Sequence, residues 1–166
     1  MFAKRHEYTL GSRWRDSTHS VAVAVALSFL FTPTLAPAAA PTGRFVPSGG
    51  TVLDKQTGLT WQQAPAPMTY TWANAMTYCS GNVAALPGSG WRLPAIKELQ
   101  ALVDDSVAAP GPTIDTSAFP STPAAIFWSS TPAVQFSSAN AWSVYFDNGS
   151  TYPSATGTAE NVRCVR

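Results

Sequence analysis

Few side chains in this sequence could carry out acid–base or nucleophilic chemistry. Its two histidines, His6 and His19, both precede an uncharged apolar run at residues 21–31. If that run belongs to a leader that is removed, no histidine remains. A Ser-His-Asp triad, a Cys-His pair and a histidine-ligated zinc or iron site are then excluded. Sites made of carboxylate and amide oxygens, such as a calcium site or a two-carboxylate glycosidase, are still allowed.

The two cysteines, Cys79 and Cys164, are the other candidates for chemistry. They lie roughly 85 residues apart, so they lack the C-x-x-C spacing of redox and metal sites. In an exported chain, an even number of cysteines is typical of disulfide bonding. We therefore predict a Cys79–Cys164 bridge, with a redox or metal-binding pair as the alternative.

The N-terminal segment has the layout of a secretory signal peptide. Basic residues precede the apolar run at 21–31, and the small residues of Ala-Pro-Ala end at Ala38. This layout is typical of cleaved leaders. We predict a signal peptide over residues 1–38 and an extracytoplasmic protein, in the periplasm or at the cell surface. A retained anchor is the alternative, but a span of about 20 apolar residues would have to include Pro33 and Pro37.

The charge of the remaining chain argues against nucleic acid as a partner. The full sequence of 166 residues has a net charge of +1, whereas the part from Ala39 onward has six basic and seven acidic residues. A protein that follows a phosphate backbone needs a clustered basic face. We therefore expect no nucleic-acid partner and no membrane span after cleavage. The length allows one domain with a substantial core.

The first part of this domain is predicted to be a small β-hairpin. Residues 39–50 are rich in Pro, Gly and Thr and are predicted to be a flexible lead-in to a domain over 51–166. Residues 51–53 and 59–61 flank a polar turn that ends in Gly58. Two short β-prone runs around such a turn favour a hairpin.

Two helices are predicted next. Residues 71–79 have apolar side chains at helical spacing, with Thr71 as a plausible N-cap. The predicted buried stripe is Trp72, Ala75, Met76 and Cys79. Residues 95–104 follow Pro94, which suits the first turn of a helix. The predicted inner face of this second helix is Ile96, Leu99, Leu102 and Val103.

The C-terminal half is predicted to be mostly β-structure. A long proline-rich loop at 106–124 precedes predicted strands at 126–130 and 142–146. Asp147-Asn148-Gly149 is a strong hairpin turn signal, and a return strand starts at Ser150. Residues 161–166 are predicted to be the last strand. The fold class is therefore α+β.

Several of these segments match, in order, the motifs of a known family. They are 52–61 (VLDKQTGLTW), 72–79 (WANAMTYC), 91–99 (WRLPAIKEL), 127–131 (FWSST) and 162–166 (VRCVR). Together they resemble the C-terminal domain of the Legionella collagen-like protein. The resemblance covers nearly all of residues 45–166.

The resemblance implies a fold and a general role. The family is similar in architecture to C-type-lectin-like domains and to the formylglycine-generating enzyme fold. It implies two helices packed on antiparallel sheets, long loops and a disulfide from the first helix to the last strand. It also implies extracellular adhesion through carbohydrate, with sulfated glycosaminoglycans as the ligands of the founding member.

Three features of this sequence limit what the resemblance implies. The sequence has no collagen-like repeats, so multivalent avidity is not expected. Its charge from Ala39 onward provides no basic patch for sulfated polymers. The calcium-dependent lectin signatures Glu-Pro-Asn, Gln-Pro-Asp and Trp-Asn-Asp do not occur in it. We predict no metal site and no cofactor.

We predict a non-catalytic binding module that recognises an extracellular glycan or a surface protein. The candidate ligand-binding residues are Asp115, Asn140, Asp147, Asn148 and Tyr152. The alternative for Asp147 and Asn148 is that they only form the turn. A structural or protein-interaction module of the cell envelope is the alternative function. An enzyme is not expected, because both cysteines are assigned to the bridge.

Other side chains are assigned mainly to structure. Four tryptophans could form a sugar platform, but their strand and motif positions favour the core. They are Trp61, Trp91, Trp128 and Trp142. Arg92 and Glu98 are predicted to form a structural ion pair rather than to take part in catalysis.

Overall fold

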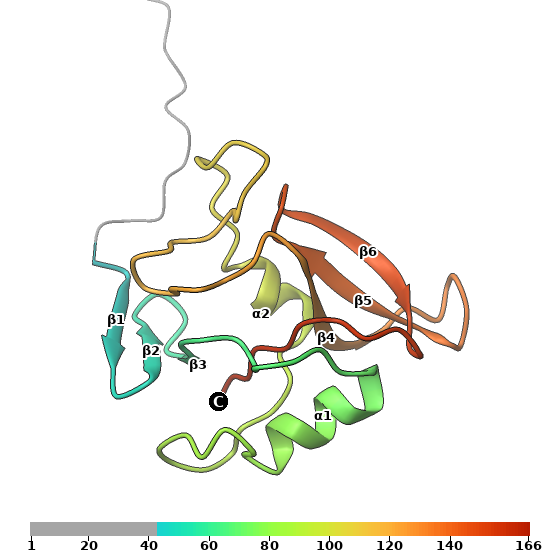
Figure 1. The fold of residues 1–166 in the computed structure, drawn as a ribbon, viewed down its shortest axis with the longest axis horizontal. Helices are drawn as coiled ribbons and strands as arrows, with labels where there is room; N and C mark the ends of the chain where they lie inside the picture. Colours follow the sequence, from blue (N-terminus) through green and yellow to red (C-terminus); the bar gives the residue numbers. More distant parts are fainter. Residues whose placement is uncertain (1–42) are drawn as a thin grey trace, which may run out of the picture. The chain divides into compact units, whose positions relative to one another are not determined.

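The computed structural model describes residues 43–166, which form two antiparallel three-stranded sheets and two helices (Figure 1). The first sheet has the order β1-β2-β3 and the second the order β4-β5-β6. The strands are β1 (Phe45–Ser48), β2 (Thr51–Asp54), β3 (Thr60–Gln62), β4 (Ile126–Pro132), β5 (Asn140–Tyr145) and β6 (Ser150–Ala155). The helices are α1 (Trp72–Ser80) and α2 (Ile96–Gln100). The predicted signal peptide, residues 1–38, lies outside the described residues. No helix within 43–166 has the length and hydropathy needed to cross a membrane.

The first sheet confirms the predicted hairpin and corrects the predicted lead-in. Strands β2 and β3 pair antiparallel, as predicted. Strand β1 occupies positions predicted to be flexible and pairs antiparallel with β2. It is ordered because Phe45 packs edge-on against Phe119, with ring centroids 5.0 Å apart. Proline is tolerated on an edge strand, so Pro47 does not prevent the pairing.

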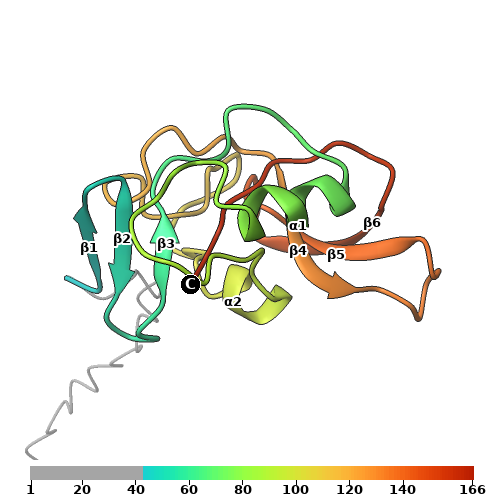
Figure 2. The same cartoon turned by 90° about the horizontal axis from the view of Figure 1, so that it is seen from below.

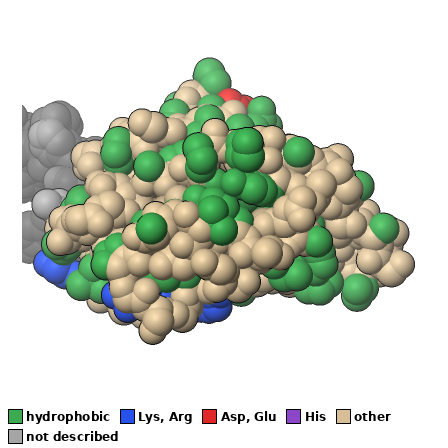
Figure 3. Space-filling model, turned by 60° about the horizontal axis from the view of Figure 1, so that its bottom comes forward, with side chains coloured by type: hydrophobic (Ala, Val, Ile, Leu, Met, Phe, Trp, Pro, Cys, Tyr) green, Lys and Arg blue, Asp and Glu red, His purple; other side chains and the backbone are tan. Residues whose placement is uncertain are grey.

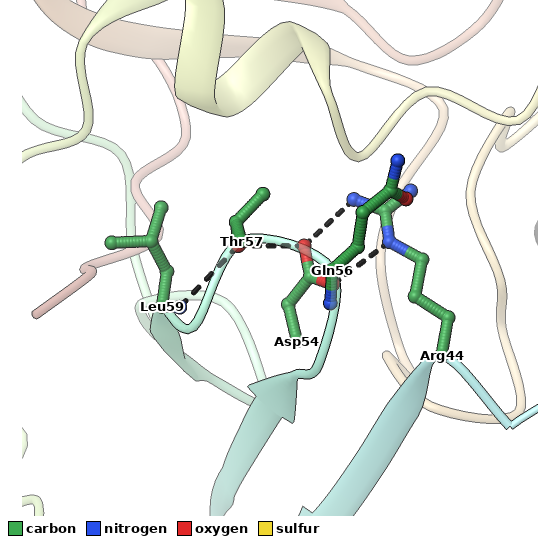
Figure 4. Close-up of polar contacts among 5 residues, drawn as sticks. All are labelled: Arg44, Asp54, Gln56, Thr57 and Leu59. Carbon is green, nitrogen blue, oxygen red and sulfur yellow. Dashed lines mark hydrogen bonds and ion pairs between the residues drawn. The ribbon is translucent and has the colours of Figure 1, made fainter.

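The turn between β2 and β3 is organised by Asp54 (Figure 4). Its carboxylate accepts hydrogen bonds from Arg44 at 2.9 and 2.7 Å, from the Thr57 hydroxyl at 2.9 Å and from the Gln56 backbone N–H at 2.9 Å. Burial by itself raises the pKa of Asp54, but these donors outweigh it and lower the pKa below its ordinary value. Asp54 is therefore a structural residue of the hairpin.

The second sheet is covered by one helix on each face (Figure 2). On one face, Trp128 and Ala141 belong to the same buried cluster as Ala75 and Cys79 of α1. On the other face, the α2 residue Leu99 belongs to a second cluster, together with further side chains of this sheet. The alternation of side chains along β4 and β5 thus divides the core into two parts.

Both predicted helices exist, with two corrections. In α1 the buried residues are Ala75, Tyr78 and Cys79, whereas Met76 is 37% exposed. The helix is rotated so that Tyr78 faces Gln62 of β3, with which it makes a hydrogen bond. Helix α2 ends earlier than the predicted residue 104, because the chain continues in tighter turns closed by i to i+3 hydrogen bonds.

The C-terminal segment, residues 161–166, passes between the two sheets without forming the predicted continuous strand. Val165 makes isolated antiparallel bridges to Trp61 and Arg92, and Asn161 makes a parallel bridge to Phe127. The segment contacts β3, Arg92 and β4 in turn, so it forms only isolated single-residue bridges with each of them. The predicted disulfide between Cys79 and Cys164 is confirmed, with a Cα–Cα distance of 5.4 Å.

Candidate functional site

A groove of about 390 Å³ lies between β3, the loop that follows it and the loop after α1. No charged side chain lines it. The lining residues are Gly50, Gln62, Gln63, Ala64, Pro65, Pro67, Tyr70, Tyr78, Val83, Ala84 and Leu86. Aromatic and apolar walls with a few placed polar groups are typical of small-molecule sites.

Gln62 and Tyr78 form the polar floor of the groove. The Gln62 Nε2 donates to the Tyr78 Oη at 3.3 Å, while its Oε1 accepts from the Cys164 backbone N–H at 3.1 Å. Both amide atoms of Gln62 are thus held in one orientation. The Tyr78 Oη acts only as an acceptor within the described residues, so its own O–H is free to donate to a ligand. Burial raises the pKa of Tyr78 above its ordinary value, which already lies well above neutral pH, so the hydroxyl is protonated there.

Tyr70 forms the aromatic wall above this floor. Its ring centroid lies 4.9 Å from that of Tyr78, and the two planes are inclined by 36°. The Tyr70 backbone is held by hydrogen bonds with Glu160 in both directions, and its carbonyl also accepts from Trp128 Nε1 at 2.8 Å. A half-exposed ring on a fixed backbone is a preorganised stacking surface.

The rim of the groove is a turn held by a single asparagine. Asn82 Nδ2 donates to the Leu86 carbonyl at 2.8 Å, and Asn82 Oδ1 accepts from the Leu86 N–H at 2.9 Å. This turn presents Val83, whose side chain is 65% exposed. A shallower hollow of about 240 Å³ shares Tyr70, Tyr78 and Val83 with the groove and continues along α1.

Two of the arginines are paired with carboxylates. Arg44 pairs with Asp54, and Arg92 pairs with Glu98 at 2.7 Å, which confirms the predicted structural ion pair. The Arg92 guanidinium lowers the pKa of Glu98, and the partly compensating effect of burial is smaller. The face drawn in Figure 3 is accordingly mostly neutral, with Lys and Arg side chains at its lower left and Asp or Glu at its top.

Arg163 is fully buried and has no carboxylate partner among residues 43–166. Its guanidinium carbon lies 4.6 Å from the centroid of Phe119 and 5.8 Å from that of Phe127. Nη2 donates to Thr122 Oγ1 at 2.7 Å, while Nε and Nη1 have no partner among the described residues. Burial lowers the pKa of Arg163 to about 9. Its cation–π contacts assign this residue to the core.

Arg163 belongs to the VRCVR motif at residues 162–166. The profile of the Lcl C-terminal domain family matches residues 50–166, which include this motif. The chain belongs to this family. The resemblance found in the sequence is therefore confirmed over most of the chain. The comparison with curated proteins finds no match.

In this Lcl C-terminal domain, the structure brings only some of the predicted ligand residues close together. Asp147 and Asn148 lie in the β5–β6 turn, and Asn140 lies at the opposite end of β5, paired with Ala155. Tyr152 lies on β6 and is 42% exposed. Asp115 lies in the loop that follows α2, and Gly111 and Thr113 of this loop donate their backbone N–H groups to the carbonyls of Asp147 and Phe146, both at 2.7 Å.

Two of these side chains are used locally. The Asn148 Oδ1 accepts from the Ser150 N–H at 3.1 Å, which stabilises the turn. The Asp115 carboxylate accepts from the backbone N–H groups of Ser117 and Ala118 at 2.9 and 3.2 Å. Both contacts are typical of Asx turns. Residues 43–166 contain no group of three or more His, Cys, Asp or Glu side chains placed to hold a metal ion.

The tryptophans separate into core and surface members. At most a few per cent of the surface of Trp61, Trp91 and Trp128 is exposed. These three residues therefore belong to the core, as their strand and motif positions predicted. Trp142 is only half-buried and lines a separate hollow. Tyr70, Tyr78 and Gln62 were not predicted as ligand residues. No local pattern marks them, because they meet only when the loop after β3 folds beside α1.

Proposed function

We propose that this domain is a non-catalytic, extracytoplasmic module that binds an uncharged glycan in the groove beside α1. The observation that carries the proposal is the combination of Tyr70, Tyr78 and Gln62 in a groove without charged lining. A tyrosine ring offers an apolar face to the C–H groups of a sugar, and its hydroxyl reaches sugar hydroxyls. Polar groups that are already oriented lose little entropy when the ligand binds.

The charge of the site supports a neutral ligand. A sulfated polymer would need several cationic side chains close together. In the described part of the chain, two arginines are paired with carboxylates and a third is buried. The exposed cations Lys55, Lys97 and Arg166 belong to three different segments, the β2–β3 turn, α2 and the C-terminal end. The sulfated ligands of the founding member are therefore not carried over to this domain.

The disulfide supports the location and the fold class of the proposal. A bridge between distant cysteines is typical of proteins that fold in an oxidising compartment. Its placement, from α1 to the C-terminal segment, supports a C-type-lectin-like arrangement of the two helices and the sheets. It also supports a non-catalytic role, since neither Cys79 nor Cys164 is free to act as a nucleophile.

The rim of the groove favours a second candidate function. Val83, which lines the groove, is 65% exposed although it is a large apolar side chain, and Met68, in the loop between two lining residues, is 62% exposed. Exposed apolar side chains beside a groove are typical of protein-binding surfaces. A protein ligand of the cell envelope is thus the alternative to a glycan.

A glycan array with the full chain, with and without calcium, tests the proposal. We expect binding to neutral oligosaccharides that does not depend on calcium. Tyr70→Ala should weaken this binding by about tenfold or more, whereas the matched change Tyr152→Ala should leave it unchanged. Binding that is lost in Tyr152→Ala and kept in Tyr70→Ala would move the site to the β5–β6 hairpin. No binding to any glycan would favour the protein-interaction alternative.

A further inference from the structure

A second hollow, of about 300 Å³, opens between α2 and the β5–β6 ribbon. It is lined by Ile96, Lys97 and Gln100 of α2, Trp142 of β5 and Thr151 of β6. The groove beside α1 shares none of these residues. One hollow lies beside α1 and the other beside α2, and these two helices cover opposite faces of the second sheet. A ligand in one hollow therefore does not touch the lining of the other.

Among the tryptophans within residues 43–166, Trp72 and Trp142 are half-buried and the others are buried. Trp72, which is also half-buried, already donates its indole N–H to the Ser129 carbonyl at 2.8 Å. Trp142 is half-buried and lines the hollow. Phe136, 60% exposed, packs edge-on against it with ring centroids 5.5 Å apart at 85°. A perpendicular aromatic neighbour restricts the tilt of the indole plane.

Lys97 gives this hollow a charge that the groove lacks. Its ammonium has no carboxylate within 4 Å in the described residues, and its polar contact there is a long one, 3.4 Å to Gln100 Oε1. An ammonium in this state can exchange a weak contact for a carboxylate at little cost in desolvation. Gln100 and the Thr151 hydroxyl add neutral hydrogen-bonding groups beside it.

We propose that this hollow, the Trp142 pocket, is a second binding site and that it takes a saccharide ring bearing one carboxylate, a hexuronic acid unit. The ring's C–H face would stack on Trp142, and its carboxylate would pair with Lys97. Gln100 and Thr151 would bind ring hydroxyls. One ammonium matches one carboxylate per sugar, in contrast to the multiple charges of a sulfated ring.

The test is a titration of the ¹⁵N-labelled full chain with a galacturonic acid trimer and, as the matched neutral ligand, a galactose trimer. The Trp142 indole N–H resonance, assigned by its loss in Trp142→Phe, reports occupancy of the pocket. We expect this resonance to shift with the acidic trimer. The dissociation constant obtained from the shift should be at least about tenfold higher for the neutral trimer. Equal responses to the two trimers, or no response to the acidic one, would overturn the proposal.

Lysine variants separate the pocket from general charge effects. Lys97→Gln should weaken binding of the acidic trimer by about tenfold, and Lys55→Gln, at an exposed lysine of the β2–β3 turn, should leave it unchanged. Both lysines are exposed, so both variants should fold. Equal losses in the two variants would show non-specific attraction and refute the site. Tyr70→Ala should retain the response, because the groove is a separate site.

Discussion

The C-terminal segment and the groove beside α1 adjoin each other, yet they are built in opposite ways. In residues 161–166 the central side chains are buried, and Cys164 is joined covalently to α1. In the groove, Tyr70 and Val83 remain accessible on a fixed backbone. Gln62 belongs to both, because it orients Tyr78 on one side and accepts from the Cys164 N–H on the other. The stability of this domain and its proposed binding surface therefore depend on largely different residues.

The largest effect is expected from removal of the disulfide. The double change Cys79→Ala and Cys164→Ala frees a loop with a sequence separation of 85 residues. On the chain-entropy model this lowers the free energy of unfolding by about 4–5 kcal/mol. Urea denaturation of the variant, with reduced wild-type protein as the control, measures the loss. A loss below about 1 kcal/mol would show that the segment is held without the bridge.

Replacement of Arg163 is expected to have the next largest effect. Arg163→Ala leaves a cavity beside Phe119 and Phe127, so the free energy of unfolding should fall by about 3 kcal/mol. Arg163→Met preserves most of the volume and removes two nitrogens, Nε and Nη1, that have no hydrogen-bond partner among the described residues, so its effect should stay below about 1.5 kcal/mol. Thermal unfolding of both variants measures the two losses of stability. Equal losses would show that the charge itself stabilises the segment.

Asp54→Asn should be less damaging. We expect the free energy of unfolding to fall by about 2 kcal/mol at neutral pH, because the charge-assisted bonds from Arg44 are weakened.

The variant should also change the pH dependence of the free energy of unfolding. The pKa of Asp54 is lower in the folded than in the unfolded state, so the unfolded state binds more protons in the window between the two values. This part of the stability is present above the unfolded pKa, near 4, and is lost on acidification through the folded pKa. Denaturation from pH 7 to pH 2 should show a smaller acid-induced loss in Asp54→Asn than in the wild type. Parallel curves would contradict the assignment.

The smallest change in stability is expected in the groove. Tyr70→Ala removes a half-exposed ring but keeps the backbone hydrogen bonds with Glu160, so the loss should be about 1 kcal/mol. Glycan binding should nevertheless fall by about tenfold. Calorimetric titration beside urea denaturation compares the two effects on one sample. A large loss of stability without a loss of binding would make Tyr70 part of the structural region instead.

Much of the fold was predictable because its signals are local. The β2–β3 hairpin, α1 and the β5–β6 turn follow from turn residues and short periodic patterns. The errors lie where packing overrides such patterns. Strand β1 depends on the contact between Phe45 and Phe119, and the rotation of α1 depends on Gln62. The end of the chain is divided between two sheets, which no single-strand pattern can represent.

The candidate site was less predictable than the fold. Asp147 and Asn148 were predicted as ligand residues because they are polar and lie in a hairpin turn. Such side chains often stabilise the turn itself, as Asn148 does through its bond from the Ser150 N–H. The groove residues have ordinary local contexts, and Tyr78 falls within a predicted helix without any sign of its polar partner. Trp142 alternates along β5 like a core residue, yet it is half-buried and lines a hollow beside α2.

The family, the bridge between the two cysteines, the low charge and the scarcity of side chains for catalysis could all be predicted from the order of residues. These properties depend on residue identity and order, and folding does not alter them. Which aromatic side chains are available to a ligand depends on the packing of the folded chain. Burial depends on what packs against a residue from distant parts of the chain: Trp61, Trp91 and Trp128 are enclosed, while Tyr70 and Trp142 face hollows lined by groups that the fold assembles.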